Sequence, residues 1–330
     1  MSELHKFLFD GLPVRGVLVR LTDAWTEILR RRASNTVSGA YAPEVAALLG
    51  EMTAAAALMQ ANIKFDGSLV LQIFGEGPVK LAVVEVQPDF ALRATAMVQQ
   101  QVPGGARFSQ LVNLHNQGRC AITLDPKTKF PGQQPYQGVV PLHDDRKQPI
   151  EKFSDVLGHY MLQSEQLDTT LVLAANDQVA AGLLIQRLPL AGSGNLAGSL
   201  VSRENEDEIG RNESYNRIAT LAASLKQHEL LTLDVQTILR RLFWEESLTR
   251  FAPLAGDAAP RFQCNCSRER VGKMIVGLGQ QEAEEILGER GQIEVGCEFC
   301  GLQYHFDPVD AAQLFVQARR ASQESGGQSH

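Results

Sequence analysis

CNCSRERV at residues 264–271 and VGCEFCGLQYHFD at residues 295–307 carry four of the five cysteines in this chain of 330 residues. The first stretch holds a Cys-x-Cys pair and the second a Cys-x-x-Cys pair. Structural zinc sites are built from four such side chains at the corners of a tetrahedron, with each sulfur about 2.3 Å from the ion. The spacing therefore predicts one Zn²⁺ per chain in the reduced state. Its expected ligands are Cys264, Cys266, Cys297 and Cys300.

The residues around the cysteines predict a small zinc module over residues 261–312. Ser267 is placed to cap a helix that ends near Gly279. Apolar residues alternate on both sides of the second cysteine pair, as expected for two short strands, and Asp307-Pro308 is typical of the start of a last helix. A module of about fifty residues has little hydrophobic core of its own, so a bound metal would hold it together.

The four-cysteine pattern excludes some chemistry and leaves two interpretations open. Four protein ligands leave no coordination position for a water nucleophile, which argues against a hydrolytic zinc enzyme. The second pair does not lie between the strand and helix of a βαβ unit, as it does in thioredoxin-type oxidoreductases. The site is then either a structural zinc knuckle or a switch, because zinc-bound thiolates can be oxidised and the metal lost with them. We do not expect an enzyme.

Residues 1–190 are predicted to form one α+β domain with a mainly antiparallel sheet and packed helices. Helix-favouring residues fill 43–63, and a further helix is expected near 149–164. Apolar segments separated by short turns indicate antiparallel pairing. The expected strands are SLVLQIF (68–74), VKLAVVEV (79–86), FALRATAMV (90–98), CAITL (120–124), QGVVP (137–141), TTLVLA (169–174) and AAGLLIQRL (180–188). Within CAITL, Cys120 is interpreted as a buried apolar residue outside the zinc site.

Residues 200–255 are predicted to form a helical linker region. It follows the small, flexible stretch AGSGNLAGS (191–199) and begins with the charged run RENEDE (203–208). Two amphipathic helices with narrow apolar stripes are expected beyond that run, and they need a partner surface, such as the sheet of the first domain. The apolar face consists of Ile218, Leu221, Leu225, Ile238, Leu239 and Leu242. The tail, residues 320–330, is expected to be disordered.

Composition and charge limit the classes of partner. The chain holds 31 Lys and Arg against 38 Asp and Glu, a formal net charge of −7. Proteins that bind a phosphate backbone usually present a basic face, so this balance argues against a nucleic-acid partner. The chain lacks a segment long and apolar enough to span a bilayer, and its N-terminus lacks the apolar core of a signal peptide. We therefore expect a cytoplasmic protein with reduced cysteines and no membrane contact.

The chain resembles the redox-regulated chaperone family known as heat shock protein 33. The two cysteine stretches match that family, and further segments match it in order from about residue 12 to about residue 310. These segments are APEVAALLGE, KFDGSLVLQIFGEGPVK, ITLDP, PYQGVVPL, SEQLDT, AGLLIQRLP and LFWEESL. The stretch SNTVSGAY within 33–41, the loop QQQVPGGARFSQLVNLHNQG (99–118) and the tail after Asp310 depart from the family.

The resemblance implies an ATP-independent holdase that is reduced, zinc-bound and inactive until oxidants and partial unfolding activate it. In that family, disulfides form between sequence neighbours, which here pairs Cys264 with Cys266 and Cys297 with Cys300. Zinc is released, the linker region loses its fold, and the activated protein dimerises. It then binds unfolding client proteins and prevents their aggregation. The alternative is a constitutive structural zinc-module protein that binds a specific protein or nucleic-acid partner.

Overall fold

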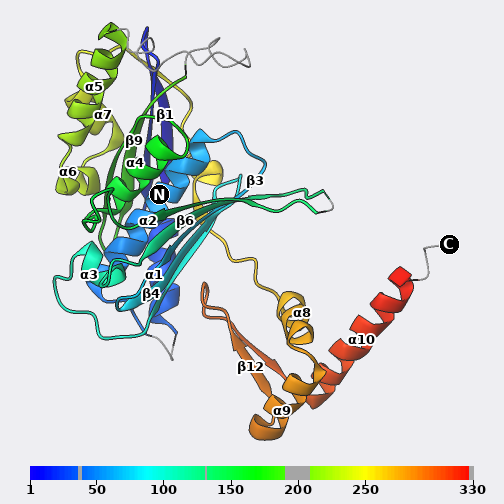
Figure 1. Ribbon diagram of the computed structural model, residues 1–330. Coiled ribbons are helices and arrows are strands. Elements are labelled where there is room, and N and C mark those ends of the chain that lie inside the picture. Colours follow the sequence, from blue (N-terminus) through cyan, green and yellow to red (C-terminus); the bar gives the residue numbers. More distant parts are fainter. Residues whose placement is uncertain (36–38, 131, 190–208, 327–330) are drawn as a thin grey trace.

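The computed structural model describes residues 1–35, 39–130, 132–189 and 209–326 (Figure 1). The flexible stretch 191–199 and the charged run 203–208, both expected at the start of the linker region, lie outside these residues. Among the described helices, none is long and apolar enough to cross a membrane.

Two β-sheets form the frame of the N-terminal domain. Sheet A has the strand order β10-β1-β2-β9-β8, and sheet B has the order β11-β5-β4-β3-β6-β7. Every strand pair in the two sheets is antiparallel except β11 with β5, which is parallel. The strands of sheet A are β1 Glu3–Phe9, β2 Val14–Leu21, β8 Thr169–Ala175, β9 Ala180–Arg187 and β10 Leu248–Arg250. Those of sheet B are β3 Gly67–Phe74, β4 Val79–Val86, β5 Ala91–Val98, β6 Arg119–Pro126, β7 Tyr136–Pro141 and β11 Arg261–Phe262.

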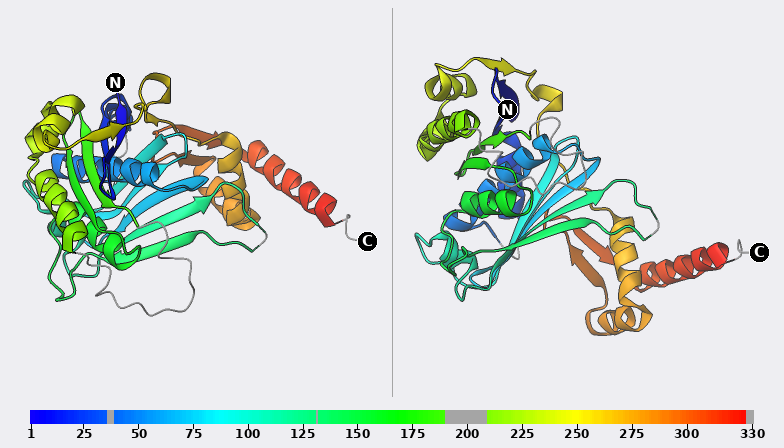
Figure 2. Two further views of the ribbon diagram at one scale, coloured as in Figure 1. Left: turned by 90° about the horizontal axis from the view of Figure 1, so that it is seen from above. Right: turned by 45° about the horizontal axis from the view of Figure 1, so that its top comes forward.

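Helix α2 (Pro43–Asn62) lies between the two sheets (Figure 2). Most of its residues are apolar or small, and from Val45 to Ala61 nearly all of them are buried, which is the pattern of a helix packed on more than one side. Val45 and Leu49 near its start and Leu58 near its end are fully buried in one core with strands of both sheets. Gly50 allows the β8–β9 turn to approach, since a Cβ at that position would lie 2.4 Å from the Cβ of Ala175.

The helices of the linker region cover the other face of sheet A. They are α5 Ile209–Ala223, α6 Gln227–Thr232 and α7 Val235–Phe243. Five of the six residues of the apolar face are buried in a core with Phe7, Phe9 and strand β9, and Leu221 is half-buried against the same core. Helix α6 was not expected, because a six-residue helix is too short to show a periodic pattern. As a result, β9 is buried on both faces.

The prediction of a mixed α+β fold with antiparallel sheets is confirmed, and each expected strand is present in the structure. Strands β1 and β2 and the helix after them, α1 (Asp23–Ala33), were not predicted. The described part of this domain also contains helices α3 Phe108–Val112, inside the atypical loop 99–118, and α4 Phe153–Gln163.

The C-terminal module contains a two-stranded hairpin and three helices. These are β12 Ile293–Gly296, β13 Gln303–Phe306, α8 Arg268–Leu278, α9 Gln280–Arg290 and α10 Pro308–Gly326. Helix α10 continues to Gly326, and its Ala, Arg, Gln and Glu residues favour helix. The expected disorder over residues 320–330 stays a prediction. Residues 327–330 lie outside the described part of the chain.

Candidate metal centre

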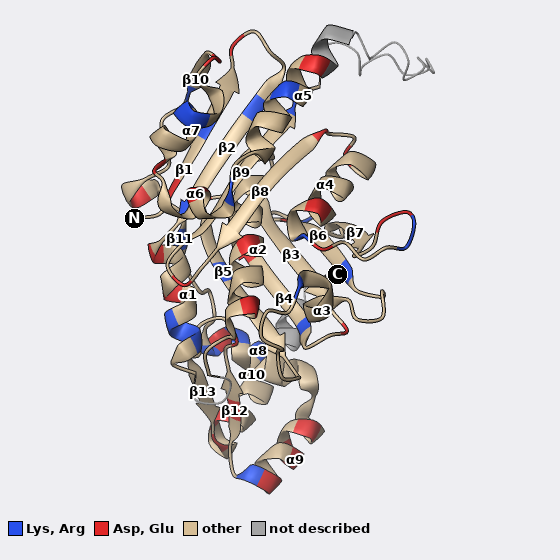
Figure 3. Cartoon of the chain, turned by 90° about the vertical axis from the view of Figure 1, so that its left-hand side faces the viewer, with Lys and Arg blue, Asp and Glu red and all other residues tan. Residues whose placement is uncertain are grey.

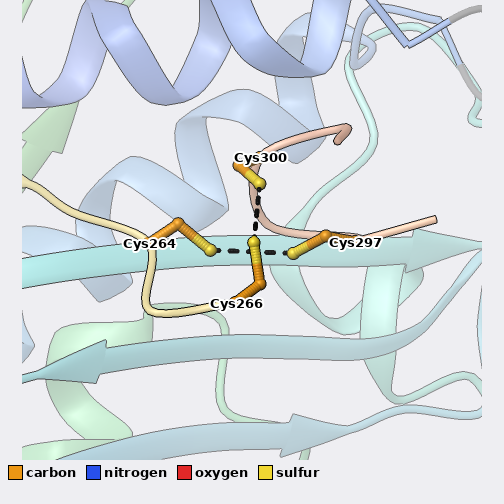
Figure 4. Close-up of side chains that lie close together, drawn as sticks. All are labelled: Cys264, Cys266, Cys297 and Cys300. Atoms are coloured by element: carbon orange, nitrogen blue, oxygen red, sulfur yellow. Dashed lines mark hydrogen bonds between the residues drawn. The ribbon is translucent and has the colours of Figure 1, made fainter. Parts of the chain in front are cut away.

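The first cysteine pair lies in the extended segment between β11 and α8. Ser267, directly after Cys266, caps α8 as expected, since its side-chain oxygen accepts a hydrogen bond from the Arg270 backbone N–H at 3.2 Å. Cys264 and Cys266 are two residues apart in this segment, and their sulfurs face the same centre (Figure 4).

The second pair lies on the turn of the β12–β13 hairpin. The Gly301 N–H donates to the Cys297 carbonyl at 2.7 Å, and the Cys297 N–H donates to the Leu302 carbonyl at 2.9 Å. Gly301 has φ of 73°, a left-handed conformation that a glycine adopts without strain. This tight turn brings the sulfurs of Cys297 and Cys300 to the same side.

The structure brings all four sulfurs into one cluster. The Cys264 and Cys297 sulfurs are 3.6 Å apart, those of Cys266 and Cys300 are 3.3 Å apart, and all four lie within 4.8 Å of one another (Figure 4). A tetrahedral ion with metal–sulfur bonds of about 2.3 Å requires sulfurs about 3.8 Å apart. None of the four is in a disulfide. The cluster therefore fits a tetrahedral metal ion with four thiolate ligands.

The thiols differ in how readily they lose a proton. Burial acts to raise the pKa of Cys266, but hydrogen bonds from Tyr304 and the neighbouring cysteines outweigh it and lower the pKa to about 7. Burial raises the pKa of Cys297 and raises that of Cys300 further. Metal binding requires all four in the thiolate form, so a bound cation would supply the charge that ionises Cys297 and Cys300.

Two side chains that contact the cluster were not found by sequence reasoning. The Tyr304 hydroxyl donates to the Cys266 sulfur at 3.2 Å, and Nη1 of Arg93, on β5, lies 4.0 Å from the Cys264 sulfur. The inward position of Tyr304 in the alternating run after the second pair was a usable signal. Arg93 had none, because 171 residues separate it from Cys264. His305 faces outward, beside Glu294 on the paired strand.

Cys120 is fully buried in the core between the sheets, as predicted, and burial raises the pKa of its thiol to about 12. It lies on β6 and is not one of the four clustered cysteines.

The apolar face of the linker region packs on sheet A, whereas the module contacts α1 and β5. Residues 244–263, here called the strap, connect the two. Within the strap, β10 adds to β1 at the edge of sheet A and β11 adds to β5 at the edge of sheet B. Side-chain contacts also hold it: Asp10 accepts hydrogen bonds from the hydroxyls of Ser247 and Thr249, and Arg261 pairs with Asp89. The strap is thus attached to both sheets.

The fold and the site together define a class of protein in which a two-sheet α+β domain is joined to a module with four clustered cysteines. The sequence model described as "Hsp33 protein" matches residues 2–307. The "33 kDa chaperonin" of Chromobacterium violaceum is 43% identical over 314 residues, covering 95% of this chain and 94% of that protein. That of Methylobacillus flagellatus is 38% identical over 316 residues, covering 96% and 94%.

A solved structure supports the same fold. The 33 kDa chaperonin (heat shock protein 33 homologue) of Thermotoga maritima matches with a TM-score of 0.71 over 96% of this chain and 99% of that one, at 20% sequence identity. The chain belongs to the Hsp33 family. The family is one of molecular chaperones and not of enzymes, so the chain has a chaperone role that involves client proteins.

Proposed function

We propose that this protein is a redox-regulated, ATP-independent holdase of the cytoplasm. Its reduced form binds one Zn²⁺ and is inactive. Oxidation converts the four thiolates to disulfides, releases zinc and unfolds the linker region, and the exposed apolar surface then binds unfolding proteins. The observation that carries the proposal is the cluster of four sulfurs within 4.8 Å of one another, in a module linked by the strap to the helices that cover sheet A.

Zinc is the ion proposed for the cluster. Thiolates favour soft or borderline metals over Mg²⁺ and Ca²⁺, and tetrahedral four-sulfur geometry is typical of zinc. Zinc also has no redox chemistry of its own, so any electrons that leave the site come from the sulfurs.

The redox step follows from the thiol chemistry. Two thiolates give two electrons to one molecule of hydrogen peroxide, which takes up two protons and leaves as two water molecules while one S–S bond forms. Two peroxide molecules therefore oxidise the whole cluster and remove all four ligands. We assign the disulfides to Cys264–Cys266 and Cys297–Cys300, because sequence neighbours stay close after the module has lost its fold. The cross-pairs Cys264–Cys297 and Cys266–Cys300 are the competing outcome, since their sulfurs are close in the folded module.

The client-binding surface is the one that the linker helices now cover. Release of α5–α7 would expose Phe7, Phe9 and Leu18 of sheet A together with the apolar face of the helices themselves. An exposed apolar area of this kind binds unfolded chains without sequence specificity. The same exposure favours a homodimer of the activated protein, and the net negative charge disfavours nucleic acid as a partner.

The test is a light-scattering assay with a thermally unfolding client protein. Reduced, zinc-loaded protein should not suppress aggregation, peroxide with mild heating should produce suppression, and a thiol reductant should abolish it. Peptide mapping of the oxidised protein should give the two neighbour disulfides, with zinc released in equal amount to protein. Equal activity in both redox states would contradict the proposal and would support a constitutive zinc-module protein instead.

A further inference from the structure

The two residues between the last two cysteines of the zinc module, Glu298 and Phe299, both contact the N-terminal domain. Oε2 of Glu298 lies 3.7 Å from Nη1 of Arg32, in the last turn of α1. The guanidinium of Arg93 lies 4.3 Å from the centre of the Phe299 ring. We call these four residues the dock. Figure 3 shows the basic end of α1 directly beside the module.

The N-terminal domain holds both arginines in place. Nε of Arg93 donates to Oε2 of Glu85, its register partner on β4, at 2.9 Å. The Arg32 side chain is only 8% exposed and stacks on the ring of Tyr41 at 4.3 Å. Its ion-pair partner among the described residues is Glu298 of the module. A buried cation is costly without an opposite charge, so the N-terminal domain depends on the module for this partner.

The dock depends on the metal centre in two ways. The positions of Glu298 and Phe299 are set by a turn whose two ends, Cys297 and Cys300, would be held by a bound metal ion. A zinc ion with four thiolates also carries a net charge of −2, and Arg93 faces it from 4.0 Å at the Cys264 sulfur. Neutral disulfides after zinc release would leave Arg93 without this charge, and the turn would no longer be held.

We propose that the dock passes the state of the metal centre to the linker region. While the ion is bound, Arg32 and Arg93 hold the module on the N-terminal domain. Loss of the ion releases the module, and β11 separates from β5. Strand β11 has only two residues, Arg261 and Phe262. Its pairing with β5 includes backbone hydrogen bonds from the Arg261 N–H to the Phe90 carbonyl at 3.1 Å and from the Gln263 N–H to the Leu92 carbonyl at 3.0 Å. Gln263 directly precedes Cys264, so release of the module removes the contacts that hold the C-terminal end of the strap. The strap then holds α7 on sheet A less firmly.

This inference deepens the proposed function and rests on it for its consequence, but the dock itself can be tested without a client protein. Hydrogen exchange measured by mass spectrometry on the full, reduced, zinc-loaded chain reports on the amides of Arg261 and Gln263. The double variant Arg32→Gln/Arg93→Gln should raise their exchange rate by about tenfold, the factor expected for losing a cation–π contact and an ion pair. One zinc per chain and the protection of α8–α10 should be retained. Arg119→Gln, on β6 of sheet B, is the matched control. It should change neither the exchange of Arg261 and Gln263 nor the zinc content.

A second pair of variants addresses the same contact from the module, in case loss of Arg93 unfolds sheet B around Glu85. Glu298→Gln/Phe299→Ser should reproduce the faster exchange, whereas Leu302→Ser, at an exposed site just beyond the pair, should not. Chelation of zinc from the wild-type protein should also expose Arg261 and Gln263. Unchanged protection in both double variants, or protection that persists after chelation, would overturn the dock. Loss of zinc in the double variants would overturn it too, since the residues would then act on the metal site. A chaperone assay that fails on oxidised wild-type protein contradicts the proposed function but leaves these exchange results intact.

Discussion

The cysteine side chains of this molecule differ strongly in how far they are buried. Cys120 is fully buried among apolar residues, whereas Cys264, Cys266 and Cys297 are only half-buried. A thiol reacts through its thiolate, and reactivity therefore follows pKa and access to solvent. Glu51 on α2 is half-buried, and it is a second side chain whose proton affinity depends on its surroundings.

Cys120 should stay unmodified during oxidation. Its pKa near 12 leaves almost no thiolate at neutral pH, and the side chain has no solvent access. Alkylation with iodoacetamide at pH 8, followed by peptide mapping, should label it only after denaturation. Cys120→Ala should be activated by peroxide like the wild type, and a variant that cannot be activated would place Cys120 in the switch.

Glu51 should make the N-terminal domain less stable at higher pH. Burial raises its pKa from 4.5 to about 7, so the folded state binds the proton more tightly than the unfolded state. Its contribution to stability is full below pH 4.5, falls as the pH rises to 7 and is level above that. Between pH 4.5 and 8, the wild type should therefore lose roughly 2 kcal/mol of unfolding free energy relative to Glu51→Gln.

Urea unfolding followed by the fluorescence of buried Trp25, in a Trp244→Phe background, measures this difference. Glu44→Gln, in the first turn of the same helix, is the control, because a hydrogen bond from the Gly105 N–H lowers the pKa of Glu44. If the unfolding free energies of wild type and Glu51→Gln changed in parallel with pH, folding would not raise the pKa of Glu51, and the prediction would be wrong.

At the scale of elements, both polar and apolar contacts hold α6 and α7 on sheet A. The Arg20 guanidinium donates to the carbonyls of Leu230 and Leu231, at 2.6 and 3.1 Å, near the C-terminal end of α6. Leu239 of α7 is 3% exposed and packs in the core shared with sheet A. Short helices are marginal alone, so both contacts determine whether the linker region stays folded.

Arg20→Gln should loosen α6 without affecting zinc. Two hydrogen bonds from a charged donor are lost, about 1.5–3 kcal/mol in local stability. Hydrogen exchange in 227–232 should be faster, and a lower temperature should be enough for activation by peroxide. Arg119→Gln on sheet B should match the wild type, and unchanged exchange in α6 would mean that Arg20 does not hold this helix.

Leu239→Asp should give chaperone activity without oxidant while zinc stays bound. A carboxylate in this core is unpaired and removes apolar packing, so at least about 3 kcal/mol of linker stability is lost. Limited proteolysis should cut the reduced variant within α5–α7, and Arg240→Asp, one residue further on the exposed side of α7, should stay resistant. A variant that is cut but never suppresses aggregation would show that linker release is not the activating step.

At the scale of the whole molecule, the described residues form three hydrophobic cores. The largest lies between the two sheets, the second joins the linker helices to sheet A, and the third belongs to the module. The module core has seven buried residues, including Ile275, Phe306 and Phe315, and is too small to be stable without a metal.

Zinc removal should therefore unfold the module alone at first. Structural zinc contributes about 10–16 kcal/mol in finger peptides, far more than such a core supplies. A chelator with reductant should abolish hydrogen-exchange protection in α8–α10 and leave β1–β9 protected. Metal-free protein that keeps protection in α8–α10 would show that the module folds on its own core.

Local spacing was enough to establish the four-cysteine module, the antiparallel strands, the capped helix after Ser267 and the apolar face of the linker helices. Each is a pattern of residues within one or two turns or strands, where backbone geometry fixes which side chains share a face. The N-terminal strands β1 and β2 were missed, although Phe7, Phe9 and Leu18 supply the surface on which that apolar face packs.

Tertiary structure alone decided which surfaces meet. It placed α2 between two sheets, attached the strap to both, and brought Arg93 to Cys264 across 171 residues and Arg32 to Glu298. These contacts join segments far apart in the chain, so no periodicity in the sequence marks them. They form because burial of the apolar faces of both sheets fixes how the elements pack. Polar side chains at the edges of the sheets are thereby brought next to each other and form ion pairs and hydrogen bonds.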